Sequence, residues 1–463
     1  MFAFLPVVVA GYYGLCRAKQ GLLAQVWMLL ASIVFYAWGR LEHLVWLVVS
    51  ILLNWAIAKI IARTSDVSTR KQWLVLGIGL NICLLGTLKY AKFILTNLSY
   101  IFPVPVVLPE VWLPLGISFF TIQQVMFLVD CYEGLVPASR LFDHATFVSF
   151  FPCVSSGPIS RVRQLLTQIQ RTQGPSAQTI TGGLVLFAIG LFKKVVLADS
   201  FAQIVDLIFN HTKTLSGIQA WLATFAYTFQ IYLDFSGYSD MAIGIGLMFG
   251  LVVPMNFDAP YRSCSIIEFW QRWHITLSKF ITVYLYTPMI RCFKQVSLVK
   301  ACIVTVLAML IAGLWHGPSW TFVTFGFLHG LALSVNQVWR KKIKIKMPTI
   351  LSWLVTFLFV SIAFVFFRSP DMMVAFETCG ALLPHGNWFG TELDKVVGRY
   401  EIAQLTVLSA VGVLASFLGP TSSQLAQGLT LSRRSALAYA SLLLVSFLFM
   451  NSTKGHDFIY FAF

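Results

Sequence analysis

The sequence contains few charged residues for its length. Only 11% of its 463 residues are charged, whereas soluble domains carry about 25%. The deficit extends along the whole chain and is not confined to one region. Hydrophobic residues make up 58% of the chain, and apolar runs recur from end to end. This composition excludes a soluble globular protein, and we expect lipid to be the solvent for most of the surface.

Several familiar site motifs are missing. The sequence has no P-loop, no GxSxG nucleophile elbow and no pair of histidines with HExxH spacing. Its eight cysteines show no CxxC or other metal-ligand spacing, and most lie within apolar segments. We interpret the cysteines as small buried hydrophobic residues. The sequence therefore predicts no metal site.

Basic residues outnumber acidic ones by 33 to 18 and lie between the apolar runs. This pattern is typical of the cytoplasmic loops of membrane proteins, so we expect no nucleic-acid partner. Clusters such as Lys193 and Lys194 are interpreted as markers of topology. The longest basic run is WRKKIKIKM at 339–347. We favour an ordinary cytoplasmic anchor there over a site for a specific lipid or acidic partner.

The apolar runs predict an all-α polytopic membrane protein with about 10–13 spanning helices. Several runs are shorter than the roughly 20 residues that a span needs, so we also expect tilted, re-entrant or interfacial helices. No internal repeat of the transporter kind is visible. The runs lie near 2–15, 22–38, 44–62, 73–97, 115–129, 180–208, 218–235, 240–255, 277–290, 299–314, 319–338, 350–367, 402–418 and 435–450.

Two stretches carry polar groups that lipid would leave without partners, and we expect irregular backbone in both. FFPCVSSGPISRVR at 150–163 is either an interhelical loop or a re-entrant segment, and its Arg161 is a candidate contact for donor phosphates. LDFSGYSDMAIGIG at 233–246 contains Asp234 and Asp240. These carboxylates either serve a site or hold a nearby arginine or helix N-terminus.

A third stretch, NFDAPYRSCSIIEFWQRWHITLS at 256–278, is amphipathic. Its Glu268, Arg272 and Thr276 recur every four residues, so we expect them to pair along one side of a helix. Three aromatic residues supply an apolar surface. We predict an interfacial or half-buried helix that ends at His274, not a membrane span.

Another histidine, His316, lies in GLWHGPSW between two apolar runs. Gly317 and Pro318 follow it, so the helix should break there. A buried histidine is usually structural, and a chemical role would require a cavity that the sequence does not show. His329 comes 13 residues later, about 20 Å along an unbroken helix. We expect it to pack against the following glycine, outside any site of His316.

Several motifs follow one another in order from about residue 113 to the C-terminus. They are LPLGISFFTIQQVMFLVDCYEG, FFPCVSSGPISR, GLFKKVVLAD, LDFSGYSDMAIGIGLMFG, NFDAPYRSCSIIEFWQRWHITLS, GLWHGPSWTFVTFGFLHG and DFIYFAF. In order and spacing they resemble the membrane-bound O-acyltransferase (MBOAT) family, in its bacterial alginate O-acetylation (AlgI-like) branch. The resemblance implies helices around a central tunnel. It also implies N-terminal membrane helices at 1–112, a catalytic core at 113–345 and C-terminal membrane helices at 346–463.

The resemblance assigns roles to two histidines. His316 matches the catalytic histidine of the family, which would act as general base, and His274 matches its second characteristic histidine. Possible supporting or donor- and acceptor-binding residues are Trp315, Asp234, Tyr238, Asp240, Asn256, Arg272 and Arg161. The stretch KFITVYLYTPMIRCFKQ at 279–295 departs from the usual pattern of the branch, which leaves donor handling and partners open.

The resemblance also implies an activity and a place in the cell. The expected reaction moves an acyl group, in this branch acetyl, from a cytoplasmic thioester donor to a hydroxyl of an exopolysaccharide such as alginate or cellulose. The donor would be acetyl-CoA or an acyl carrier protein, periplasmic proteins would complete the transfer, and no cofactor would be bound. We expect a multi-pass protein of the bacterial inner membrane.

Four alternatives stay open at this point. Two are enzymatic, because SSGPISR leans toward D-alanyl transfer and peptidoglycan O-acyl transfer is a related reaction. A third is a transporter or channel subunit of polysaccharide export, although no repeat symmetry supports it. The fourth is an inactive scaffold, against which the presence of both His274 and His316 argues.

Overall fold

The chain folds into two units that are built from helices. The computed structural model describes residues 3–102, 113–171, 174–209, 215–384, 388, 399–428, 432–452, 455–456 and 458–459, and regular structure within them is entirely helical. One unit comprises Met1–Phe187 with Ala242–Pro254, and the other comprises Ala188–Met241 with Met255–Phe463. The predicted all-α class is confirmed. The three-region organisation taken from the family resemblance stays a prediction.

The first unit is a set of helices, two of which are joined by hydrogen bonds between buried polar side chains. Asn54 of α3 and Asn81 of α4 exchange side-chain amide hydrogen bonds of 3.2 and 2.6 Å. Such bonds join helices where no water competes for the amides. The helices are α1 (Phe4–Arg17), α2 (Gly21–Ala37), α3 (Leu41–Arg63), α4 (Val67–Leu85), η1 (Gly86–Tyr90), α5 (Ala91–Ser99), α6 (Ile117–Tyr132), α7 (Leu141–Ser149), α8 (Phe151–Val154), α9 (Val162–Arg171) and the start of α10 (Ala177–Phe192).

The polar segment at 150–163 is buried in the first unit. All residues from 150 to 160 are buried, and α8 is the only regular element among them. The backbone N–H of Phe151 donates to the Ser32 hydroxyl at 3.2 Å. This is how irregular backbone is tolerated at membrane depth, because protein groups replace water. The segment is a buried connection between α7 and α9, and the choice between an interhelical loop and a re-entrant segment stays a prediction.

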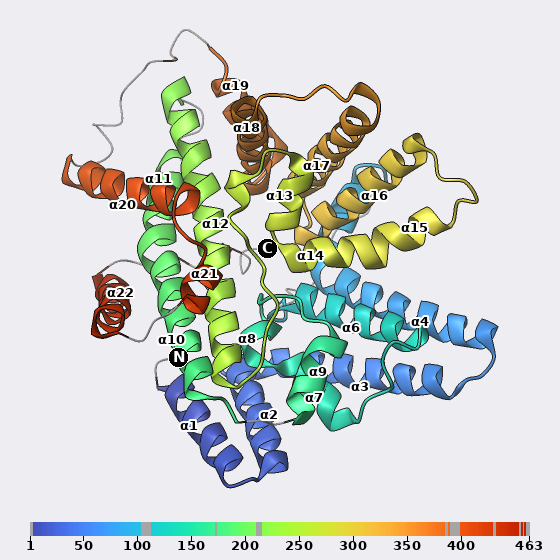
Figure 1. The fold of residues 1–463 in the computed structure, drawn as a ribbon. Coiled ribbons are helices and arrows are strands. Elements are labelled where there is room, and N and C mark those ends of the chain that lie inside the picture. The colour runs from blue at the N-terminus through green and yellow to red at the C-terminus, as the bar shows by residue number, and fades with distance from the viewer. Residues whose placement is uncertain are drawn as a thin grey trace. The chain divides into compact units, whose positions relative to one another are not determined.

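The second unit contains most of the remaining helices (Figure 1). They are η2 (Lys193–Ala198), α11 (Asp199–Phe209), most of α12 (Gly217–Met248), η4 (Pro260–Arg262), α13 (Ile266–Arg272), α14 (Ile275–Phe280), η5 (Ile281–Tyr286), α15 (Thr287–Arg291), α16 (Leu298–His316), α17 (Trp320–Val338), η6 (Trp339–Ile343), α18 (Thr349–Arg368), α19 (Met372–Ala381), α20 (Arg399–Phe417), α21 (Ser422–Gln427) and α22 (Arg433–Ser452).

The expected irregularity at 233–246 was wrong. This stretch lies within α12, a continuous helix of 32 residues that joins the two apolar runs predicted there. The helix continues because its carboxylates find cationic partners on η2, so they need no break in the backbone. The helix packs closely against α10 at Gly237, where an added Cβ would collide with the carbonyl oxygen of Gly190.

A tight hairpin of α16 and α17 carries His316. The two helices lie side by side (Figure 1) and make extensive contact. Gly313 and Gly326 allow this approach, since a Cβ on Gly313 would collide with the backbone of Phe322 and Gly326. The predicted break is confirmed, because α16 ends at His316 and α17 starts at Trp320.

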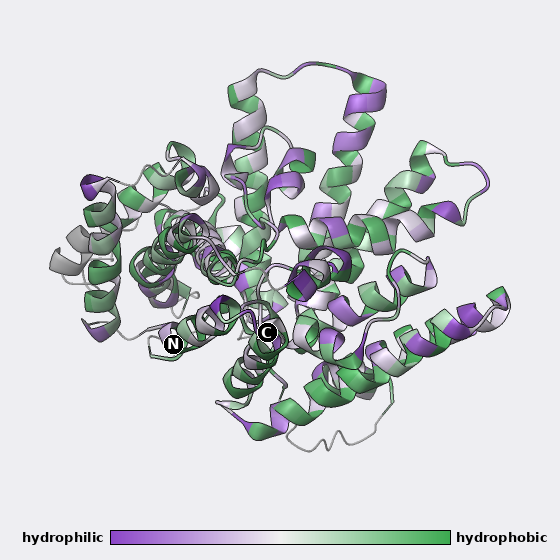
Figure 2. Ribbon diagram, turned by 60° about the horizontal axis from the view of Figure 1, so that its bottom comes forward, coloured by the Kyte–Doolittle hydropathy of each residue, from purple (hydrophilic) through white to green (hydrophobic). Residues whose placement is uncertain are grey.

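The outer faces of the helices are apolar. On α16, four side chains at every fourth position are exposed, namely Val299, Ile303, Leu307 and Ile311. Figure 2 shows hydrophobic residues over most of the long helices, with hydrophilic ones more frequent toward helix ends and loops. Such stripes are stable against lipid and not against water. The protein is therefore a multi-pass membrane protein.

Six helices among the described residues are long and apolar enough to cross a membrane. Five further apolar helices are shorter, between 10 and 17 residues. Length and composition alone do not decide whether the shorter ones cross. The expected number of spans, about 10–13, therefore stays a prediction.

The hairpin contact gives a stability prediction. Gly313→Leu should destabilise the protein by about 1–3 kcal/mol, because the new side chain has no space against α17. Thermal unfolding of the purified protein in detergent measures the effect as a lower Tm. Gly79→Leu is the matched control, since nothing lies within 4 Å of a Cβ there. An equal Tm for the two variants would contradict the packing described for the hairpin.

Candidate active site

His316 closes α16 within an aromatic enclosure. The residue is 5% exposed, and its ring centroid lies 5.0 Å from that of Trp315 and 5.1 Å from that of Phe367. Phe322 and Phe325 of α17 lie slightly farther away, at 6.4 and 6.1 Å. The end of α16 and the start of α17 hold the ring in place. The imidazole is thus kept largely away from water, in the low-dielectric surroundings that strengthen its electrostatic interactions.

His274 does not end a helix as expected. Helix α13 ends at Arg272 and α14 begins at Ile275, and His274 lies between them in the left-handed region with φ 40° and ψ 54°. A non-glycine residue there costs about 1–3 kcal/mol and needs support from its surroundings. The sequence could not reveal this conformation, because nothing local requires it.

Asn256 supplies much of that support. Its side-chain Oδ1 accepts hydrogen bonds from His274 Nδ1 at 3.0 Å and from the Thr276 hydroxyl at 2.9 Å. Its Nδ2 donates to the Ser239 hydroxyl at 3.3 Å, and its backbone carbonyl accepts from the Ile275 N–H at 2.9 Å. Asn256 and His274 are both fully buried. This amide therefore fixes the position of the His274 ring.

The same contact sets the protonation of His274. Because Asn256 Oδ1 can only accept, Nδ1 of His274 carries the proton and Nε2 carries the lone pair. Burial lowers the pKa of His274 to about 3, so the ring is neutral at pH 7. A fixed neutral imidazole can accept a hydrogen bond at Nε2 without first losing a proton.

Trp315 brings the two histidines into one cluster. Its ring lies 5.0 Å from His316 and 6.4 Å from His274, between centroids. Phe235 of α12 covers His274 edge-on at 4.7 Å. The structure therefore groups four predicted site residues, which are His316, His274, Trp315 and Asn256.

Asp234 and Asp240 hold two lysines of η2 and not an arginine. Lys194 lies 2.9 Å from Asp234 and 2.6 Å from Asp199, and Lys193 lies 2.8 Å from Asp240. All of these side chains are mostly buried, so the two lysines are not markers of a cytoplasmic loop as the sequence indicated. A hint was their place inside the apolar run 180–208, where an unpaired cation would be costly.

The C-terminal segment lies against the same face of α12. The backbone N–H of Ile459 donates to Asp234 at 2.9 Å, and Lys194 donates to the His456 carbonyl at 2.8 Å. The Phe458 ring stacks on the predicted residue Tyr238 with centroids 4.6 Å apart. It also lies 5.8 Å from Phe235, the ring that covers His274. Sequence reasoning missed this contact.

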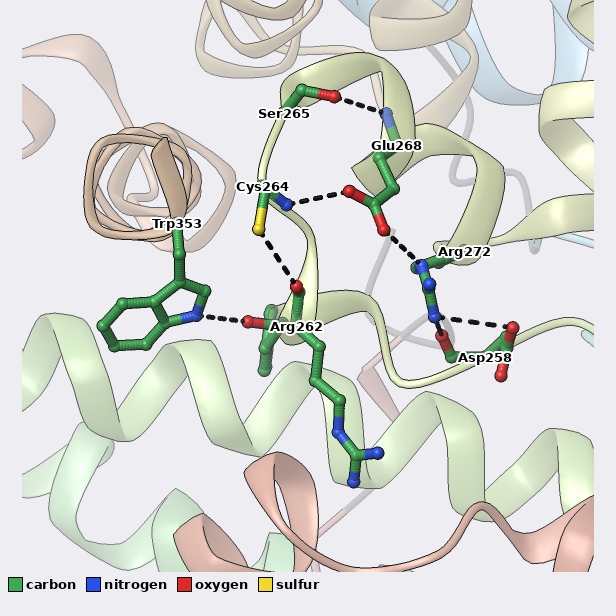
Figure 3. Close-up of polar contacts among 8 residues, drawn as sticks. Asp258, Arg262, Cys264, Ser265, Glu268, Arg272 and Trp353 are labelled. Carbon is green, nitrogen blue, oxygen red and sulfur yellow. Dashed lines mark hydrogen bonds and ion pairs between the residues drawn. The ribbon is translucent and has the colours of Figure 1, made fainter. Parts of the chain in front are cut away.

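Arg272 belongs to a surface network and not to the histidine cluster. Figure 3 shows its guanidinium between Glu268, at 3.0 Å, and Asp258, at 3.6 Å. The predicted pairing with Glu268 is confirmed. Thr276 does not join it, because its hydroxyl bonds to Asn256. Arg272 thus stabilises the turn that leads into His274.

Two further residues that the sequence singled out have different surroundings. Arg161 belongs to the first unit, just before α9, and its proposed contact with a donor stays a prediction. His329 is buried on α17 and accepts a hydrogen bond from Trp270 at 3.2 Å. Its ring meets Phe325 edge-on and lies parallel to Phe269, so its contacts are aromatic.

Comparisons with known proteins identify the family of this chain. The sequence model of the membrane-bound O-acyltransferase family matches residues 117–370, more than half of the chain. The chain belongs to this family. It is therefore an O-acyltransferase, and both histidines fall within the matched region. The predicted membership is confirmed.

Its relatives include acetyl- and alanyltransferases of envelope polymers. The peptidoglycan O-acetyltransferase of Helicobacter pylori is 37% identical over 100% of this chain and 96% of its own length. The probable alginate O-acetylase AlgI of Azotobacter vinelandii is 38% identical over 90% of this chain and 82% of its own length. The teichoic acid D-alanyltransferase of Bacillus subtilis is 29% identical over 55% of this chain and 68% of its own length.

The role of Asn256 gives a test. Asn256→Ala should lower kcat roughly 100-fold, because His274 loses the partner that fixes its ring and tautomer. Asn256→Asp should keep more activity, since a carboxylate accepts the same proton. Its negative charge would raise the pKa of His274, so the pH–rate profile should move to higher pH. Wild-type kcat in Asn256→Ala would contradict this role.

The lysine pair gives a second test. Asp234→Asn should destabilise the protein by about 1–3 kcal/mol, because Lys194 loses one of its two carboxylate partners and keeps only Asp199. The readout is Tm in detergent. A triple variant, Lys194→Met with Asp199→Leu and Asp234→Leu, should recover much of the loss, because it leaves none of these three groups buried without its partner. An additive loss in the triple variant would show that the three groups are not energetically coupled.

Proposed function

We propose that this O-acyltransferase moves an acetyl group from a cytoplasmic thioester to a hydroxyl of an exopolysaccharide of the alginate or cellulose kind. The observation that carries the proposal is the pair of buried histidines around Trp315. One of them has its tautomer fixed by Asn256. Relatives named alginate O-acetylases match 90% of the chain or more, which supports this acceptor.

The chemistry follows from the two imidazoles. His316 takes the proton of the acceptor hydroxyl as general base. The oxygen attacks the thioester carbonyl, the new C–O bond forms, and the C–S bond breaks. The proton passes from His316 to the leaving thiolate, so the protein ends unchanged. Nε2 of His274 accepts a hydrogen bond from a neighbouring hydroxyl of the acceptor sugar and so orients the sugar for attack.

The enclosure of His316 has a purpose in this scheme. A thioester hydrolyses if water replaces the acceptor, and the rings of Trp315, Phe322 and Phe367 restrict water at the imidazole. The proposal includes a tunnel through which the acyl group crosses the membrane. Acetyl-CoA or an acyl carrier protein would deliver the group from the cytoplasm. Proteins in the periplasm would accept it, which places the enzyme in the bacterial inner membrane.

Peptidoglycan is the second candidate acceptor. The relative from Helicobacter pylori, named for that reaction, aligns with the whole chain and nearly all of its own length. Both reactions esterify a sugar hydroxyl, so the same histidine chemistry serves either one. D-alanyl transfer has weaker support, because the relatives of that name match only about half of this chain.

Ester analysis in cells tests the proposal. His316→Ala should remove acetyl ester from the secreted polysaccharide while the protein persists in the membrane, because no base remains to activate the hydroxyl. A histidine outside the cluster, His43→Ala, is the matched control and should keep the ester. Muropeptide analysis of the same cells separates the two acceptors.

Each result has a defined meaning. Loss of ester from muropeptides alone would replace the exopolysaccharide by peptidoglycan. Normal ester in both polymers in cells that produce only His316→Ala would refute catalysis by His316.

A further inference from the structure

The ends of α16 and α17 opposite His316 form an exposed basic surface. Side-chain contacts hold these ends together, with Ser334 donating to the Cys302 carbonyl at 3.2 Å and Gln337 to the Thr305 hydroxyl at 3.1 Å. The segments on either side of the hairpin therefore meet at this end. Their cationic residues, here called the basic rim, are Arg291, Lys294, Lys300, Arg340, Lys341, Lys342, Lys344 and Lys346.

The basic rim has no acidic counterpart nearby in the sequence. No aspartate or glutamate occurs between Glu268 and Asp371. Every residue from 341 to 350 is exposed. The rim therefore carries a concentrated positive charge. An anion that balances this charge must come from outside the stretch between Glu268 and Asp371.

Apolar side chains alternate with the lysines of the rim. From Lys342 to Met347 the sequence runs lysine, isoleucine, lysine, isoleucine, lysine, methionine. Ile345 is 62% exposed, and Ile350 at the start of α18 is 79% exposed. The indole N–H of Trp339 donates to the Ile345 carbonyl at 2.9 Å and folds the segment back on η6. Water alone is a poor solvent for such a mixture, whereas a membrane surface suits both kinds of side chain.

We propose that the basic rim binds the headgroups of anionic phospholipids at the membrane surface. Helix α18, which follows the rim directly, is long and apolar enough to span the membrane, so the rim lies at the level of the headgroups. Lysines meet the lipid phosphates there, and the alternating isoleucines enter the acyl region. Trp339 is the type of residue that favours this interface.

The position of the rim distinguishes a lipid from the acyl donor, which also carries phosphates. Helix α16 has 19 residues from Leu298 to His316, so the rim and the imidazole are separated by about 27 Å along its axis. A donor with its phosphates on the rim would have to span that whole distance to bring its thioester to His316. A lipid headgroup has no such requirement, so the distance favours lipid as the occupant.

Lipid titration of the purified full-length protein tests this inference. In a zwitterionic detergent, dioctanoyl phosphatidylglycerol should raise Tm at concentrations at least about tenfold lower than dioctanoyl phosphatidylcholine does. The variant with Lys341, Lys342, Lys344 and Lys346 each replaced by Gln should lose this preference. Inorganic phosphate should not reproduce the effect, because it offers nothing to the isoleucines.

A charge-matched control separates the rim from net charge. Replacing Lys71, Lys92, Arg433 and Arg434 by Gln removes the same four charges from other exposed positions, and this variant should keep the preference for phosphatidylglycerol. An equal loss in both variants would overturn the inference, as would equal responses to the two lipids. A rim variant that binds phosphatidylglycerol normally but shows a higher KM for the acyl donor would identify the rim as a donor surface instead.

Discussion

The hydrogen bond from His274 to Asn256 is the contact on which the histidine cluster depends. It holds His274 in a backbone conformation that a histidine would otherwise avoid, and it decides which ring nitrogen carries the proton. The bond is possible because α13 and α14 return the chain to Asn256, while Ser239 of α12 accepts from the other end of the amide. The buried Asn256 side chain thus connects α12, which carries Asp234 and Asp240, to the turn between α13 and α14 that contains His274.

The same constraint, that buried polar groups need partners inside the protein, shapes the rest of the second unit. Lysines of η2 neutralise the carboxylates of α12, which lets α12 continue as one helix. The C-terminal segment also hydrogen-bonds to this ionic cluster. Its Phe458 ring packs near Phe235, the ring that covers His274. The imidazoles of His316 and His274 therefore lie in surroundings where only a few atoms are polar.

The helices and the break at His316 could be predicted from the sequence, because hydropathy patterns and a Gly-Pro pair determine structure among neighbouring residues. The grouping of His316, His274, Trp315 and Asn256 followed from the family resemblance and not from spacing. Three features were beyond the sequence: the continuity of α12, the left-handed His274 and the burial of Lys193 and Lys194. Each depends on contacts with residues that are distant in the sequence, so no local sequence pattern predicts it.

The most direct measurement of the central claim is transfer across a sealed membrane by the purified protein. Proteoliposomes would receive a radiolabelled acyl thioester on the side that corresponds to the cytoplasm, with a hydroxyl acceptor polymer trapped inside. The account predicts labelled ester in the lumen with wild type and none with His316→Ala, although both proteins are inserted equally. Label found only on an acceptor added to the donor side would contradict transfer through the protein.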